Sequence, residues 1–522
     1  MAIKKVLGAI ALLSISLHGQ LVDQTKSPNP AKEGIAKSLT EEIGAGRGDW
    51  NTPNSSSFVI ARDPFRAIRR GRQLFQRKFQ RLDGSGPYNR DGSGDIAADN
   101  GIGAGSSDSC SACHGRPRGS AGFGGDVATR PDSRDAPHLF GLGLKEMLAD
   151  EITAELRDWR RLAITEATLS KTAVTRQLSS KGISYGRITV RPDLVVDTSE
   201  LEGVDADLRV RPFFHQGGTI SIREFVIGAM NAEMGFQSSD AELTAAAKGG
   251  RMVTLSGMVL DGKLDKLEMP PAADTMKVAV GEPVRNQMAI AVVDYLEFYL
   301  LNYFKPAVYR ETVESRMGRA TLDRIGCTSC HVADLQIDRD RRVADVETAY
   351  DAERGNLNNL FATAATRFTA STPDGTGFPV VKTPSLQPFL VKNIFTDFKR
   401  HDLGPNFNER NYDGTTRTQM MTTALWGVGS TGPYGHDGRS INLHEVILRH
   451  GGESQRARDA YAGLTTGEQR NLQDFLQTLI VFPPDDTASN LDPGDKSAPG
   501  FPQVRHGSIG LTTLFNVTTE IE

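Results

Sequence analysis

Two short stretches, SCSACHG at residues 109–115 and GCTSCHV at residues 326–332, decide how this sequence is interpreted. They contain all 4 cysteines of the 522-residue chain, and a histidine directly follows each cysteine pair. In a C-x-x-C-H motif the two thiols add across the two vinyl groups of one haem, and the adjacent imidazole binds its iron. The sequence therefore predicts two covalently bound haem c groups.

Two other interpretations of the cysteines are weaker. A C-x-x-C disulfide or a thioredoxin-type site needs no histidine after each pair. A zinc site with four thiolate ligands has the right number of cysteines, but the two pairs lie far beyond the spacing of a zinc ribbon. The predicted attachment and proximal-ligand residues are therefore Cys110, Cys113 and His114, followed by Cys327, Cys330 and His331.

The charge balance excludes one class of partner. Lys and Arg number 60 and Asp and Glu number 64, which gives a formal net charge of −4. No basic excess is available to neutralise a phosphate backbone, so we expect no nucleic-acid partner. The 53 glycines indicate a chain rich in loops.

The N-terminus is typical of a secretory signal. Lys4 and Lys5 precede an apolar run over residues 6–17 that is too short to span a bilayer as a helix. A buried N-terminal helix is the alternative, but the polar segment that follows gives it nothing to pack against. We expect residues 1–19 to be a signal peptide and residues 20–59 an extension. The mature protein is expected to be periplasmic or secreted, with no membrane span.

Apolar residues at helical spacing predict five helices. They lie in the segments 65–79, 144–159, 289–303, 315–326 and 464–479. In the segment 315–326 the apolar face is assigned to Met317, Leu322 and Ile325. No stretch shows period-two alternation over several strands. We therefore expect a mainly α fold, with two cytochrome c-like haem domains, long loops and few short strands.

The helices and motifs suggest a division of the chain. The N-terminal haem domain is placed at residues 60–283, the C-terminal haem domain at 284–485 and a surface tail at 486–522. A glycine- and aspartate-rich segment before the first motif raises the possibility of calcium binding through Asp91, Asp95 and Asp99. It lacks the glycine at position six and the closing glutamate of an EF-hand loop, so a solvated loop is favoured.

Longer stretches resemble the di-haem oxidoreductases, a family related to bacterial di-haem cytochrome c peroxidase. The C-terminal resemblance is strongest in TTALWGVGSTGPYGHDGRSINLHEVILRHGGE, residues 422–453. The N-terminal resemblance lies in RRGRQLF (69–75), RDAPHLFGLGL (134–144) and RPFFHQGGTISIREFVIGAMNAEMGF (211–236). The resemblance implies an N-terminal haem where peroxide or oxygen reacts and a C-terminal haem that relays electrons.

The resemblance also implies roles for individual residues. His114 and His331 are the expected proximal ligands, and His450 is the expected distal ligand of the second haem. A bis-histidine iron has a lower potential than a histidine/methionine iron and binds no substrate, so the second haem is expected to transfer electrons. Glu233 is the candidate acid–base residue that moves a proton between the two oxygens of peroxide. The alternative is a surface glutamate on a helix.

The sequence departs from the family around the first haem. His215 stands where the family has an inter-haem tryptophan, and Phe225 stands where it has a glutamine. These changes argue against the family's aromatic route through the tryptophan and predict a more apolar pocket. His138 is a possible distal ligand of the first haem, but an open, five-coordinate iron is the preferred expectation.

Four further residues near the motifs have weaker assignments. His436 is interpreted as a packing group rather than a ligand, and Trp426 as a side chain that packs against the second haem. Arg439 is either a partner of a haem propionate or a solvated charge. His401 is expected to contact the haem region.

Together these features predict a secreted di-haem c-type cytochrome oxidoreductase. Its expected reaction is peroxide reduction at the N-terminal haem, with electrons relayed through the C-terminal haem from a small cytochrome c or cupredoxin. One alternative is a di-haem dioxygenase acting on a hydrophobic substrate, as in the rubber oxygenases that resemble the same family. A non-catalytic electron-transfer cytochrome is the other.

Overall fold

The computed structural model describes residues 38–79, 83, 108–114, 134–236, 240–270, 288–302, 307–308, 311–342, 349–351, 355–357, 368–369, 380–381, 388–411 and 413–480. The predicted signal peptide, the aspartate-rich segment with Asp91, Asp95 and Asp99, and the predicted tail at 486–522 lie outside these residues. Among the described helices, none combines the length and the apolarity needed to cross a membrane.

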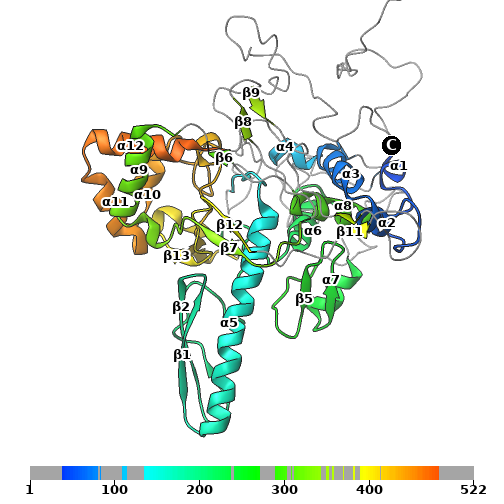
Figure 1. Cartoon of the computed structure of the whole chain (residues 1–522), viewed down its shortest axis with the longest axis horizontal. Coiled ribbons are helices and arrows are strands. Elements are labelled where there is room, and N and C mark those ends of the chain that lie inside the picture. The colour runs from blue at the N-terminus through cyan, green and yellow to red at the C-terminus, as the bar shows by residue number, and fades with distance from the viewer. Residues whose placement is uncertain are drawn as a thin grey trace, which may run out of the picture.

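The described part of the chain is mainly helical, as predicted. The helices are α1 (Leu39–Ile43), α2 (Ser56–Arg62), α3 (Pro64–Gln76), α4 (Cys110–His114), α5 (Leu142–Ser170), α6 (Ile222–Ala232), α7 (Ala241–Ala247), α8 (Ile290–Leu301), α9 (Val313–Arg324), α10 (Leu443–Arg449), α11 (Gln455–Ala462) and α12 (Thr466–Thr478). Figure 1 shows α9 to α12 gathered at one end of the molecule and α1 to α3, α6 and α8 at the other.

Most strands are short and form two-stranded ladders. They are β1 (Val174–Ser180), β2 (Ile183–Val190), β3 (Val196–Asp197), β4 (Arg251–Val253), β5 (Val259–Asp261), β6 (Ala307–Val308), β7 (Leu335–Ile337), β8 (Ala349–Asp351), β9 (Gly355–Leu357), β10 (Phe368–Thr369), β11 (Val380–Val381), β12 (Phe389–Val391), β13 (Arg400–Asp402), β14 (Glu409–Arg410), β15 (Thr416–Arg417), β16 (Gln419–Met421) and β17 (Leu479–Ile480). The sheet β1-β2-β3 is the exception, with three strands in sequence order.

One hydrophobic cluster is centred on α3 and α8. Helix α8 is apolar nearly all round and buried, as predicted for residues 289–303. It approaches α3 closely because Gly71 has no side chain: a Cβ there would lie 2.3 Å from the carbonyl oxygen of Tyr295. Ile68 and Leu74 of α3 belong to this cluster, and Cys110 of the first motif packs against it.

A second cluster lies along α5. This helix has 29 residues and is about 44 Å long at 1.5 Å per residue. The antiparallel hairpin β1–β2 lies beside it, and together they project from the body of the molecule as an arm (Figure 1). The cluster joins arm residues to side chains from the second half of the chain, among them Ile337, Val391 and Trp426.

A third cluster packs α9 against α12. Helix α12 begins with the capping box of Thr465 and Glu468, and its buried face contains Leu472 and Phe475, as predicted. Helix α9 contributes Leu322, and Cys327 of the second motif packs against the cluster. The prediction for Met317 is wrong, because this side chain is 54% exposed.

An ion network joins α6 and α8 to the N-cap of α7. The guanidinium of Arg223 is fully buried and contacts the carboxylates of Asp240, Asp294 and Glu297. Burial disfavours the charge of Arg223, but the three carboxylates outweigh this and raise its pKa above the ordinary value. The network fixes α6, the helix that ends at Glu233.

Candidate functional site

The two cysteine motifs occupy local turns suited to attachment of a planar group. The first forms α4, and the second begins with a 3₁₀ turn at Cys327–Ser329. None of the four cysteines, all within the described residues, forms a disulfide, and all are half-buried. Burial raises the pKa of Cys110 to about 12 and that of Cys327 to about 11. The two motifs lie beside separate hydrophobic clusters, since Cys110 packs against the α3–α8 cluster and Cys327 against the α9–α12 cluster.

The histidines of the two motifs have matching surroundings. Nδ1 of His114 lies 2.7 Å from the carbonyl oxygen of Pro137, and Nδ1 of His331 lies 3.0 Å from that of Phe395. A carbonyl oxygen only accepts, so each Nδ1 carries the hydrogen and each Nε2 keeps its lone pair. Metal-binding histidines are oriented by this kind of bond. Both Nε2 atoms could therefore bind a metal ion.

His450 repeats the same arrangement at the end of α10. Its Nδ1 lies 2.8 Å from the carbonyl oxygen of Val446, one helical turn earlier, which again leaves Nε2 with a lone pair. Burial, with a smaller contribution from the nearby His331, lowers the pKa of His450 to about 4, although the bond to Val446 opposes the shift. The structure thus brings together His331 and His450, which lie far apart in the sequence, as two neutral imidazoles.

Glu233 lies at the C-cap of α6 and is half-buried. Burial lowers the pKa of His114, while the hydrogen bond to Pro137 and the charge of Glu233 act in the opposite direction. The predicted acid–base residue is therefore close enough to the predicted proximal ligand for their charges to interact. Phe225, on the same helix, lies with its ring centroid 6.5 Å from that of His114.

Both ring nitrogens of His138 are already occupied. The N–H of Phe140 donates to Nδ1 at 3.2 Å, and Nε2 lies 3.0 Å from the carbonyl oxygen of Trp426. Burial lowers the pKa of His138 to about 3, so the ring is neutral with its hydrogen on Nε2. In this arrangement His138 offers no lone pair to an iron, which favours the open site over ligation by His138.

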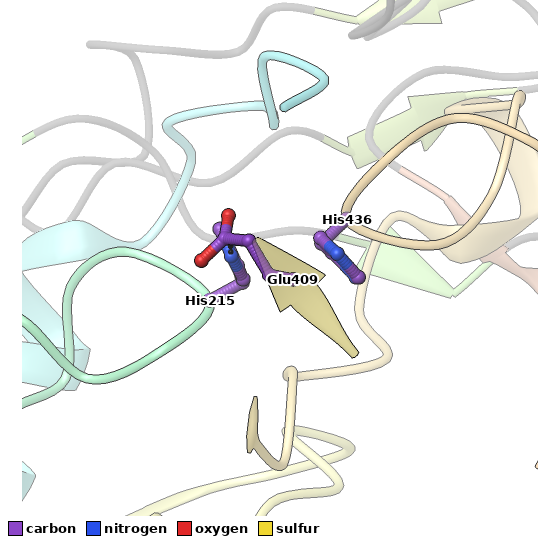
Figure 2. Close-up of side chains that lie close together, drawn as sticks. All are labelled: His215, Glu409 and His436. Carbon is purple, nitrogen blue, oxygen red and sulfur yellow. Dashed lines mark hydrogen bonds and ion pairs between the residues drawn. The ribbon is translucent and has the colours of Figure 1, made fainter. Parts of the chain in front are cut away.

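His215, the residue in place of the family's tryptophan, lies at the contact between the two halves. Its ring stacks on that of His436, with centroids 4.6 Å apart and planes at 19°. Its Nε2 lies 3.0 Å from Oε1 of Glu409 on β14. Figure 2 shows the three side chains converging from three separate segments of the chain.

The donor atoms of His215, Glu409 and His436 lie within 4.8 Å of one another, but the arrangement suits an ion-pair cluster better than a metal. Arg134 and Arg417 both donate to the Glu409 carboxylate. Burial raises the pKa of Glu409, but the bonds from His215 and Arg134 lower it far below its ordinary value. Two nearly parallel stacked rings do not direct their lone pairs at one point.

His401 lies beside the second motif, as expected. Its Nε2 lies 2.9 Å from Asp397 and its Nδ1 lies 2.7 Å from Glu453. Burial lowers the pKa of His401, but the bond to Asp397 and contact with Cys330 outweigh this and raise it to about 11. This side chain is therefore a cation at neutral pH, held next to the second attachment site.

The buried polar atoms of the described residues that have no partner in the protein include Nε1 of Trp426 and Nδ1 of His436. An indole N–H can donate to a haem propionate, and the prediction that Trp426 packs near the second haem agrees with this. Arg439, the other propionate candidate, is largely exposed and pairs with Asp437.

The sequence did not point to several of these partners. Pro137 and Phe395 act through their backbone carbonyls, so their side chains carry no signal. Glu409 and Asp397 are acidic residues that belong to no recognisable sequence motif. Only the fold shows that each lies against a histidine.

Part of the C-terminal half of the chain matches a known family model. No curated protein matches the chain. A solved structure titled "Crystal structure of a MauG-like protein associated with microbial copper homeostasis" aligns with 85% of this chain and 95% of that chain, at 16% identity and a TM-score of 0.30. Residues 334–479 match the family model described as "Di-haem oxidoreductase, putative peroxidase". Over these residues the chain is similar to the di-haem oxidoreductase family.

Proposed function

We propose that the protein is a secreted di-haem c-type cytochrome oxidoreductase that reduces peroxide. The proposal is based on the hydrogen bonding that His114, His331 and His450 have in common. Each donates its Nδ1 hydrogen to a backbone carbonyl and keeps a free Nε2 lone pair. Three imidazoles prepared in this way, two of them in C-x-x-C-H motifs, supply one ligand for the first iron and two for the second.

The residues that would hold the groups divide between the two motifs. Cys110, Cys113 and His114 would hold the first haem, and Cys327 and Cys330, with His331 and His450, the second. When bound, the haems would supply one-electron redox chemistry, with peroxide reacting at the first and electrons from a small cytochrome c or cupredoxin arriving through the second. Periplasmic or secreted localisation is part of the proposal and is supported by the signal-like N-terminus.

The residues near His114 support a catalytic site over a simple electron carrier. His138 keeps both nitrogens in hydrogen bonds to the backbone, so it leaves the first site open. Glu233 lies at the end of a helix fixed by the Arg223 network. There it would accept a proton from the inner oxygen of peroxide and return it to the outer oxygen, which leaves as water.

One observation favours a second candidate, dioxygenation of a hydrophobic substrate. Phe213 and Phe214 pack against Phe225, with ring centroids 6.0 and 5.3 Å from it. Phe225 in turn lies with its ring centroid 6.5 Å from that of His114, so this aromatic group makes one side of its surroundings apolar. Such a surface would exclude water and suit a hydrocarbon chain.

Spectroscopy of the purified holoprotein separates these functions. Peroxide reduction predicts two haems per chain in a pyridine haemochrome assay, and one high-spin and one low-spin ferric signal in electron paramagnetic resonance. Added peroxide should change the high-spin signal. Two low-spin signals in every redox state would instead support the carrier. An unchanged spectrum with peroxide, together with a stable oxygen adduct, would support the dioxygenase.

A further inference from the structure

His138 connects the two halves of the chain through its imidazole. Its Nε2–H donates to the carbonyl of Trp426, 288 positions later in the sequence. The ring has no freedom to turn away, because the Phe140 N–H holds Nδ1 and Gly427 lies against the ring. A Cβ at Gly427 would lie 2.8 Å from Nε2 of His138.

On the N-terminal side, His138 is one peptide unit from the ligand of the first motif. The carbonyl of Pro137, the preceding residue, accepts the Nδ1 hydrogen of His114 at 2.7 Å. The imidazoles of His114 and His138 are therefore joined by one hydrogen bond and a short run of covalent bonds.

On the C-terminal side, the connection continues to the ligand of the second motif. Leu425 precedes Trp426, and its N–H donates to the carbonyl of Ile394 at 3.0 Å. The next carbonyl, that of Phe395, accepts the Nδ1 hydrogen of His331 at 3.0 Å. Four hydrogen bonds and the covalent bonds between them thus link His114 to His331 without a non-bonded gap.

We propose that this link is the route by which single electrons pass between the groups held by His114 and His331, with His138 as its bridging residue. The inference rests on the proposed function, since it requires redox groups at both histidines. In each transfer one group loses an electron and the other gains it. No proton has to move, because every hydrogen of the link stays on its donor nitrogen.

A second series of contacts also crosses between the halves. It runs through the rings of His114, Phe225, Phe214, His215, His436, Phe407 and His450. Several of its steps are contacts between non-bonded rings, including 6.5 Å between His114 and Phe225 and 6.2 Å between His436 and Phe407. Electronic coupling decays more steeply across non-bonded contacts than through covalent and hydrogen bonds, and this difference favours the link through His138.

The test compares holoproteins in which one histidine is changed. A flash-activated photoreductant delivers less than one electron per protein, and absorbance at the high-spin and low-spin bands follows its redistribution between the haems. His138→Phe keeps the ring but removes the donor to Trp426, and should slow redistribution by about tenfold or more. His138→Gln keeps an N–H donor of similar reach and should retain the wild-type rate. His444→Phe is the matched control, because His444 bonds only the Tyr461 hydroxyl among the described residues.

The outcomes are distinct. An unchanged rate in His138→Phe, with two haems bound, overturns the inference and leaves the proposed function intact. A rate lowered by His215→Leu, which removes a ring from the series, but not by His138→Phe assigns the route to the ring series instead. Fewer than two haems per wild-type chain would contradict the proposed function itself.

Discussion

The ring of His215 stacks on that of His436, with centroids 4.6 Å apart, although the two residues come from opposite halves of the chain. Glu409 accepts from His215 and is itself held by Arg134 and Arg417. This cluster fixes the contact between the halves and gives it a pH dependence.

Acid should weaken this contact through His215. Burial lowers the pKa of His215 to about 4, although the bond to Glu409 opposes the shift. In the unfolded chain the histidine has its ordinary pKa of about 6.5. Between pH 6.5 and pH 4 it is therefore protonated in the unfolded state but not in the folded state. Stability present above pH 6.5 should therefore be lost as the pH falls towards 4, by on the order of 3 kcal/mol. Urea unfolding of wild type and His215→Asn at pH 7 and pH 4.5 measures it; parallel losses in both proteins would contradict the assignment.

Removing the carboxylate of Glu233 should slow peroxide turnover. Glu233→Gln keeps the size of the side chain but cannot accept a proton, so turnover should fall by about 100-fold or more. Steady-state assays with a reduced small cytochrome as donor measure the effect. Glu314→Gln on the exposed start of α9 is the control and should leave the rate unchanged. Equal rates in both variants would remove Glu233 from the mechanism.

Changing His450 should alter only the second haem. His450→Met replaces an imidazole by a thioether, so the midpoint potential of the low-spin haem should rise. His450→Ala should convert the low-spin ferric signal to high spin. His444→Gln, on the same helix, should do neither. Redox titration and electron paramagnetic resonance provide the two readouts, and retention of the low-spin signal in His450→Ala would assign the sixth ligand to another residue.

The buried ion network should be the most sensitive point for folding. Arg223→Met leaves three buried carboxylates without their cation and should cost about 3 to 5 kcal/mol of unfolding free energy. Arg187 pairs with Glu200 at the surface. Arg187→Met should therefore cost less than about 1 kcal/mol. Denaturant titration of both variants at neutral pH tests the contrast, and similar small losses would show that the network is not stabilising.

Local patterns in the sequence predicted much of the helical structure. Thr465 and Glu468 mark the start of α12, and the stripe from Leu144 to Trp159 lies within α5. The hairpin β1–β2 was not predicted. Its register shifts between Gln177 and Ser179, which interrupts the alternation of buried and exposed residues that marks a strand.

The residues of the candidate site could be predicted where they belong to a local sequence motif. His114 and His331 follow from the C-x-x-C-H pattern, and the structure gives both the bond that a ligand needs. The link through His138 was not predictable, because its partner is a backbone carbonyl far along the chain and any residue can supply one. Contacts with backbone carbonyls depend on the fold, so the types of the residues involved do not predict them.

The apolar cluster along α5 has a consequence for how the protein is made. It combines Leu148 and Ile152 with Ile337, Val391 and Trp426. When only about the first 300 residues have been synthesised, the partners of α5 from the second half of the chain are not yet present. The apolar face of α5 is therefore fully buried only after these later segments have been made. Expression of the N-terminal half alone would leave that apolar surface exposed and prone to aggregation.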